Sequence, residues 1–468
     1  MALTGPLDGP PVLSPAPVLA MLRAVTEQLA EVTALTGSGS GSGVRADPWE
    51  LLTGRAALAG FTRHGRLSAG GASRLLRSAD GWSAVTLSRP DDAAAVPAIL
   101  GALGDPGADA AGGAGTPSLG VLSGAIYPKG HPISGLAGGT PDVGGSAWEA
   151  LEAAARRHPA AALADAAQLL GVPAVALPRD PPDRRTAPWP PWRVSRIAAP
   201  SPAARLAGAV VADLSSMWAG PLCARLLGLA GADVIKVETP GRPDGARAGD
   251  PEFFGWLHAG HRSLLADFRT EDGRAALARL LSAADVVIEA SRPRALANLG
   301  LAPESVPHRD GQVWLSITGY GRDTPERVAF GDDAAVAGGL VGWADGGGDP
   351  VFCADAVADP LTGVCGALAI ATSIAAGGGE LIDLAMRSVA AGFAAAPGCD
   401  HGPHEIRPDG AVICPLLGRA QPVLPPRRPR PDGRAPAPEL GADTAAVLDW
   451  LAGPGRPGRL GRLRRSGA

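Results

Sequence analysis

The sequence predicts an α/β protein whose larger part is a mostly parallel sheet covered on both faces by helices. From about residue 206 onward, short apolar runs alternate with amphipathic segments, which is typical of strands joined by crossover helices. Each of these runs is apolar along nearly its whole length, as expected for strands buried on both faces. The expected strands are residues 209–214, 233–238, 285–289 and 313–318.

The expected helices between these strands begin and end for local reasons. Gly231 ends the first helix, and Thr270 is suited to cap the second, whose first turn holds Glu271 and Asp272. The layout is Rossmann-like, but the turn after the first strand, residues 215–221, lacks the G-x-G-x-x-G pattern. A dinucleotide cofactor is therefore not indicated.

Residues 49–180 are expected to form a smaller α+β domain placed ahead of the large one. Two strands, 74–76 and 82–87, are expected to pair around the turn Ala79-Asp80-Gly81, with helices at 93–103, 148–157 and 160–170. Residues 1–48 are expected to hold a helix at 18–35 and then a Gly/Ser linker. A Pro-rich linker at 181–203 leads to the large domain at 204–398. Residues 399–468 are expected to form a Pro/Arg-rich tail with a strand at 411–415 and a helix at 442–451.

Composition excludes several classes of function. The net charge is −4 and no basic tract is present, which argues against a nucleic-acid partner. The five cysteines are scattered and lack C-x-x-C spacing, which indicates a reducing compartment and no zinc site. No secretory pattern opens the chain, and no run approaches the roughly 20 apolar residues of a membrane span. We therefore expect a cytoplasmic protein without a membrane partner.

The most informative stretch is residues 357–363 with the apolar run behind it. Asp359 is expected to cap the start of a helix, with Pro360 as its first residue. Residues 364–376 carry no charge, so this helix is expected to be buried. A carboxylate at that point lies in the positive field of the helix start, which suits an acid that stays ionised and attacks an electrophile. The alternative is that Asp359 only caps a core helix.

Several motifs, in order, resemble those of the family III CoA-transferases, the CaiB/BaiF family. Residues 229–238 (LAGADVIKVE) are close to the family's LGADVIKVE, and residues 316–321 (SITGYG) nearly match SITGFG. Asp359 falls where the family keeps its catalytic aspartate. Further similar motifs are residues 219–221 (AGP), 261–263 (HRS), 284–289 (ADVVIE), 331–333 (GDD) and 379–384 (GELIDL). The resemblance covers about residues 207–395.

The N-terminal part resembles the small domain of the same family. Gly70 and Gly71 would belong to its glycine loop, and residues 79–82 (ADGW) resemble its hairpin. In the usual family order this domain follows the large one, whereas here it precedes it, and residues 434–448 resemble the family's ending. We therefore expect a rearranged domain order; the alternative is a fusion with a truncated first copy.

The resemblance implies transfer of CoA from an acyl-CoA thioester to a free carboxylic acid through covalent intermediates on Asp359. No metal or redox cofactor is needed, and coenzyme A is a substrate. The Gly70-Gly71 loop would cover the intermediates, unless it is an ordinary turn. The expected substrate- and CoA-binding residues are Trp218, Ala219, His261, Arg262, Tyr320 and Asp333. For His261 and Arg262 the alternative is a solvated surface pair. The family's interlocked homodimer is the expected assembly.

Two other functions stay open. An α-methylacyl-CoA racemase of the same family needs two proton-transfer groups, but Asp332 stands where the racemases carry His, and Arg89 where they carry Glu. The second alternative is a non-catalytic homologue that acts as a binding or scaffold subunit. It is credible because Ala290, Ser291 and Asn298 replace residues common in the family's CoA pocket.

Overall fold

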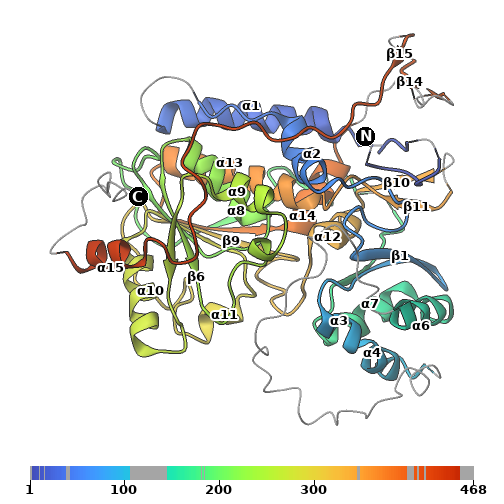
Figure 1. Ribbon diagram of the computed structural model, residues 1–468, viewed down its shortest axis with the longest axis horizontal. Coiled ribbons are helices and arrows are strands. Elements are labelled where there is room, and N and C mark those ends of the chain that lie inside the picture. Colours follow the sequence, from blue (N-terminus) through green and yellow to red (C-terminus); the bar gives the residue numbers. More distant parts are fainter. Residues whose placement is uncertain are drawn as a thin grey trace.

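The structure is a computed structural model, shown in Figure 1. It describes residues 3–9, 11–14, 16–37, 43–105, 145–180, 182–183, 185–344, 348–397, 405–407, 411–415 and 418–453. Most of the predicted Gly/Ser linker, residues 38–42, lies outside the described residues.

The centre of the molecule is a seven-stranded, mostly parallel sheet. Its strand order is β4-β12-β9-β8-β5-β6-β7, and β4 alone among these runs antiparallel to its neighbour, β12. The strands are β4 (Trp192–Arg196), β5 (Val210–Asp213), β6 (Asp233–Glu238), β7 (Arg262–Leu265), β8 (Val286–Glu289), β9 (Val313–Thr318) and β12 (Glu380–Ala385). The prediction of an α/β fold around a mostly parallel sheet is confirmed.

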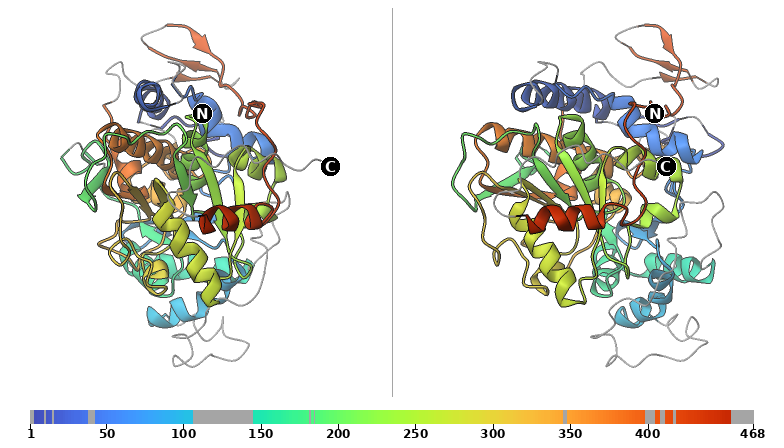
Figure 2. Two further views of the ribbon diagram at one scale, coloured as in Figure 1. Left: turned by 90° about the vertical axis from the view of Figure 1, so that its left-hand side faces the viewer. Right: turned by 60° about the vertical axis from the view of Figure 1, so that its left-hand side comes forward.

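Helices cover both faces of this sheet (Figure 2). On one face α13 (Ala358–Ala375) packs on α8 (Ala219–Leu229), and α1 (Val18–Thr36) lies over α13. On the other face α10 (Glu271–Ala283) packs beside α15 (Thr444–Ala452). Within the described residues, α13 is the helix long and apolar enough to cross a membrane, and most of it is buried in this core.

A smaller unit precedes the large sheet in the chain. Its antiparallel sheet consists of β1 (Ser73–Ser78), β2 (Gly81–Thr86) and β3 (Ala174–Ala176), and the predicted hairpin turn at Ala79-Asp80 is confirmed. The helices that pack with it among the described residues are α3 (Pro90–Ala94), α4 (Val96–Ala102), α6 (Gly145–Arg157) and α7 (Ala160–Leu169). The sheet also packs against α12 (Gly331–Ala337) and β10–β11 (Val341–Trp343, Pro350–Phe352), which connects the two parts of the molecule.

Two expectations about elements are wrong. The segment 181–203, expected to be a linker, contains β4, whose residues pair with the otherwise open edge of β12. The single helix expected at 93–103 is interrupted at Ala95, which separates α3 from α4. Pro97 explains the interruption, because proline lacks the N–H that would continue the helical hydrogen bonds.

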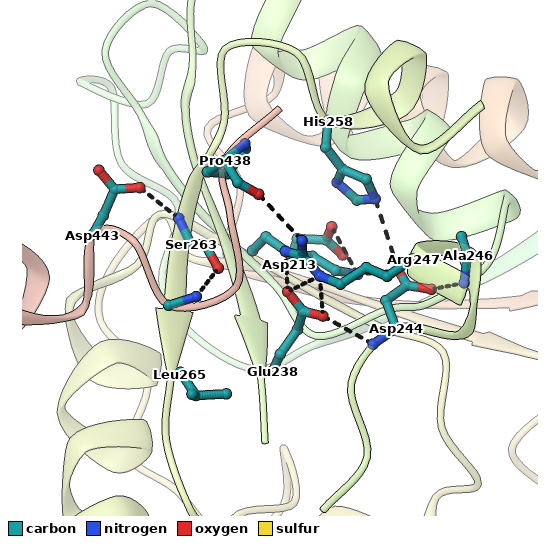
Figure 3. Close-up of polar contacts among 12 residues, drawn as sticks. Asp213, Glu238, Asp244, Ala246, Arg247, His258, Ser263, Leu265, Pro438 and Asp443 are labelled. Atoms are coloured by element: carbon teal, nitrogen blue, oxygen red, sulfur yellow. Dashed lines mark hydrogen bonds and ion pairs between the residues drawn. The ribbon is translucent and has the colours of Figure 1, made fainter. Parts of the chain in front are cut away.

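The closing tail covers the edge strand β7 (Figure 3). Asp443 Oδ2 accepts a hydrogen bond from the backbone N–H of Ser263 at 2.9 Å. Thr444 Oγ1 accepts from the N–H of Leu265 at 3.0 Å, and the Ser263 hydroxyl accepts from the N–H of Gly441 at 2.9 Å. An open edge strand would present these N–H groups to other chains, so the tail closes this side of the sheet.

Replacing both acceptors, in the variant Asp443→Ala/Thr444→Val, is expected to lower the free energy of unfolding by about 1 to 3 kcal/mol, because two strand N–H groups lose their partners. Urea denaturation gives the free energy, and limited proteolysis of the tail reports its release. Asp449→Ala, on the exposed face of α15, is the control. An unfolding midpoint unchanged from wild type would show that the tail does not stabilise the sheet.

Candidate active site

A cavity of about 320 Å³ lies at the carboxyl ends of the strands of the large sheet. Open α/β sheets bind their ligands at this edge. The cavity wall includes residues that follow β5, β6, β8 and β9, among them Ser216, Met217, Thr239, Ala290, Ser291 and Gly319. Asp359, at the start of α13, also lies in the wall. The cavity therefore joins the strand ends to the carboxylate that the sequence singled out.

Buried charges hold the loop after β5. The ammonium of Lys236 on β6 is 2.8 Å from the Asp244 carboxylate and 3.8 Å from that of Asp213, and it donates to the Ser215 carbonyl. Asp244 in turn accepts from the N–H of Met217 at 2.9 Å. Met217 has a φ of 74°, a strained left-handed conformation for a residue with a side chain. The charges therefore fix a strained residue in the cavity wall.

The same network continues through Glu238 (Figure 3). Glu238 is among the residues that line the cavity, and its carboxylate accepts from the Asp244 N–H at 2.9 Å and from Arg247 at 2.7 Å. Burial raises the pKa of Asp213. At Asp244 burial acts in the same direction, but the Lys236 ammonium and the N–H donors of Ala246 and Met217 together lower the pKa. Lys236 and Asp244 therefore form the ion pair at the centre of the network.

The backbone before Asp359 is strained, and α13 begins earlier than the sequence predicts. Ala354 and Ala356 have φ values of 59° and 41°, and the Asp359 N–H donates to the Ala356 carbonyl at 2.9 Å. The helix starts at Ala358, so Asp359 is its second residue and the prediction that it caps the helix is wrong. Because of this turn, Asp359 lies within the first turn of α13 instead of at the capping position, and it forms part of the cavity wall.

Gly331 at the start of α12 packs directly on the Asp359 carboxylate. A Cβ at this position would lie 2.2 Å from Oδ2 of Asp359 and 2.4 Å from the Ala356 carbonyl oxygen. The backbone of Gly331 also hydrogen-bonds to the carboxylate, which favours its charged form. Glycine is required here because any side chain would displace Asp359.

Asp359 shares its surroundings with two more carboxylates and one arginine. Arg55, on α2 (Pro48–Ala59), forms an ion pair with Asp355 at 2.8 Å. Burial raises the pKa of Asp359 to about 7, the Arg55 charge opposes this, and Asp332 and Asp355 add to the rise. Asp355 shows the same pattern, with a pKa of about 6. Asp359 therefore changes its charge near neutral pH.

Asp332 connects the loop before Asp359 to the predicted glycine loop. Its Oδ1 accepts from the Ala356 N–H at 3.0 Å, and its Oδ2 accepts from the Ser73 hydroxyl at 3.2 Å. Ser68, at the other end of the glycine loop, also hydrogen-bonds to Asp332. One carboxylate thus contacts segments that are more than 250 positions apart in the chain.

Gly70 and Gly71 lie in the loop between Ser68 and Ser73. Gly71 has a φ of 78°, and its N–H donates to the Ser68 carbonyl at 2.8 Å, which closes a tight turn. A Cβ on Gly70 would lie 3.4 Å from Nη2 of Arg55. The glycine loop and Asp359 therefore share Arg55 and Asp332 as neighbours.

The other predicted binding residues lie mostly away from the cavity. Ala219 is in its wall, but Trp218 is buried against Phe253, with ring centroids 5.5 Å apart. His261 is buried, and burial holds its pKa well below the usual range, so it is neutral and does not suit a phosphate contact. Arg262 lies on β7, outside the cavity wall.

Tyr320 and Asp333 are also outside the cavity wall. The Tyr320 ring lies under the guanidinium of Arg327, 5.2 Å from its centroid. Asp333 is fully buried, accepts from the Thr86 hydroxyl at 3.2 Å and has its pKa raised to about 8 by burial. Its contact with β2 indicates that Asp333 attaches the small unit to α12.

Sequence reasoning missed Arg55. No motif marks it, and the residues around it were assigned to the small domain without a role. The available signal is a single arginine in the middle of an apolar stretch, residues 51–58 (LLTGRAAL), where burial of a charge requires a partner. No cluster of three or more His, Cys, Asp or Glu side chains that could hold a metal occurs among the described residues.

Comparisons with known proteins agree with the motifs. Residues 206–428 match the model of CoA-transferase family III. Succinate–glutarate CoA-transferase of Agrobacterium fabrum is 36% identical over 207 residues, which cover 39% of this chain and 51% of the relative. Human succinyl-CoA:glutarate CoA-transferase is 33% identical over 173 residues, which cover 34% of this chain and 39% of the relative.

A crystal structure of a CaiB/BaiF family protein from Brucella suis is 33% identical and covers 41% of this chain and 55% of that chain, with a TM-score of 0.36. The chain spans about half the length, or less, of the curated relatives named here. The family match begins at residue 206, so the small unit and α2 lie outside it. Residues 206–428 of this chain are a CoA-transferase family III domain of the CaiB/BaiF type.

Proposed function

We propose that this chain transfers CoA from an acyl-CoA thioester to a free carboxylic acid, with Asp359 as the nucleophile. The observation that carries the proposal is the position of Asp359: it lies in a cavity wall at the strand ends, inside the family-matched segment. The names of the relatives, which specify succinate and glutarate, support carboxylic acids as the substrate class and favour dicarboxylates as the first to be tested.

The first half of the reaction moves CoA onto the protein. A carboxylate oxygen of Asp359 attacks the thioester carbonyl carbon, the C–S bond breaks, and CoA leaves as a thiolate, which gives a mixed anhydride. The thiolate then attacks the aspartyl carbonyl of this anhydride. The anhydride C–O bond breaks, the donor acid leaves as its carboxylate, and an aspartyl-CoA thioester remains.

The second half reverses these steps with the acceptor acid. Its carboxylate attacks the aspartyl thioester, expels the thiolate and forms a second anhydride. The thiolate attacks the acceptor carbonyl, the new acyl-CoA leaves, and the Asp359 carboxylate is regenerated. Charge balances at each step without a net proton transfer, because one anion replaces another.

Local groups suit these steps. Each attack on the aspartyl carbonyl places negative charge on its oxygen, and the Gly331 N–H is the donor next to that carboxyl group. The glycine loop, attached to Asp332 through Ser68 and Ser73, would cover the intermediates and keep water away. Water exclusion matters because an anhydride hydrolyses readily.

Asp359→Ala is expected to abolish covalent labelling, because no other residue is proposed to attack the thioester. Wild type and variant would be incubated with a panel of acyl-CoAs, dicarboxylyl-CoAs first, and quenched with hydroxylamine for intact-mass spectrometry. Asp272→Ala is the matched control, since Asp272 is also an acid in the first turn of a helix but is exposed. A wild type that neither forms an adduct nor binds CoA would favour a non-catalytic homologue.

The rate of acyl-enzyme formation is expected to rise with pH and to reach half its maximum near pH 7. Only the ionised carboxylate attacks, and the pKa of Asp359 is raised to about 7, so the reactive fraction grows as the pH rises through that value. Rapid-quench mass spectrometry between about pH 5 and 9 measures this rate. A rate that is already maximal at about pH 5 would contradict the assignment.

Gly331→Ala is expected to slow acyl-enzyme formation by roughly a hundredfold, because the new Cβ displaces the carboxylate from its position. Gly255→Ala in α9 (Pro251–His258) is the control, since a Cβ there meets no atom within 4 Å. Circular dichroism verifies that both variants are folded. Equal rates in the two variants would show that Gly331 does not position Asp359.

A further inference from the structure

Arg55 is a mostly buried cation that the proposed chemistry does not yet use. It comes from α2, outside the family-matched segment, and its side chain is 14% exposed. The guanidinium lies 5.2 Å from the centroid of the Phe61 ring and 5.4 Å from that of Trp218, and it forms a 2.8 Å ion pair with Asp355. Aromatic faces and a carboxylate both favour a cation here, so Arg55 is held in one place.

The charges that face Asp359 come from several elements. Arg55 on α2 favours the ionised form of Asp359, whereas Asp332 on α12 and Asp355 in its own loop disfavour it. The charged residues that line the same cavity from other elements are Glu238, Arg242, Arg292 and Arg327. One guanidinium, ion-paired with Asp355 in the loop before α13, thus acts on the charge of three carboxylates, those of Asp332, Asp355 and Asp359.

We propose that Arg55 is a positioning residue for Asp359: anchored to Asp355 and seated next to the glycine loop, its guanidinium balances the charge of the nucleophile. In the proposed reaction Asp359 alternates between a carboxylate and a neutral acyl group. A fixed positive charge stabilises the carboxylate both before the first attack and when it leaves in the last step. The role of Arg55 in catalysis rests on the proposed function, whereas its effect on the charge of Asp359 can be tested without that function.

The test is a titration of Asp359 in the full chain without any substrate. Protein labelled with ¹³C at the aspartate carboxyl carbon would be titrated by NMR, and the Asp359 signal would be assigned by its absence from Asp359→Asn. Arg55→Met is expected to move the midpoint up by about one pH unit or more, because an opposite charge nearby is removed. Asp355→Asn is expected to move it down, because a like charge is removed.

Two further variants separate charge from structure. Arg55→Lys keeps the charge and is expected to titrate within about half a pH unit of wild type. Arg74→Met is the matched control, because Arg74 is also paired with a carboxylate (Glu152, 3.0 Å) and stacked on a tryptophan (Trp148, 4.7 Å), but in the small unit. It is expected to leave the midpoint unchanged.

An Asp359 midpoint that is the same in Arg55→Met as in wild type would overturn the inference. If Arg55→Met does not fold, the other two variants decide. The inference is overturned if the Asp359 midpoint does not move down in Asp355→Asn. It is also overturned if the midpoint moves far up in Arg55→Lys. Adduct formation in wild type without these shifts would refute the role of Arg55 alone. If the Asp359 midpoint shifts as expected but wild type forms no adduct, the proposed transferase reaction is refuted, whereas the effect of Arg55 on the charge of Asp359 stands.

Discussion

The buried ammonium of Lys236 is the interaction on which the shape of the site depends. It lies between two carboxylates in a part of the molecule that water does not reach, and leaving either acid without it would cost several kcal/mol. Because Asp213 ends β5 and Lys236 lies on the neighbouring strand β6, this charge also ties these two strands to the loop that carries Ser215 and Met217. The cavity wall therefore forms only when sheet and loop form together.

Asp332 has the corresponding role between the two parts of the chain. The small unit has its own core and the large sheet has two, so the site depends on the contacts that join the two parts. Asp332 accepts hydrogen bonds from the glycine loop and from the turn before Asp359, and the neighbouring Asp333 accepts one from β2. A small displacement of the glycine loop would for this reason also displace the turn before Asp359, and the reverse.

Periodicity and turn chemistry predicted the elements that depend on local sequence. Strand β6, the Ala79-Asp80 hairpin and the Thr270 cap of α10 agree with the structure, since each is determined by a few adjacent residues. β4 was missed because it is defined by the edge it covers. At the site, Asp359 and the glycine loop were recognisable as motifs. Arg55 was not, because its importance comes from residues about 300 positions away. The burial of His261 likewise depends on packing that one sequence does not reveal.

The long span of these contacts has a consequence for how the chain is made. The Thr4 hydroxyl accepts a hydrogen bond from the Ala354 N–H, which lies 350 positions later in the chain. The Ser263 N–H donates to Asp443, which lies 180 positions after Ser263. At ordinary synthesis rates, the first segment waits roughly 20 to 70 seconds for its partner to leave the ribosome. During that interval the apolar face of α1 has no α13 to cover it. The order of the parts thus leaves α1 in need of protection from aggregation until α13 has been synthesised.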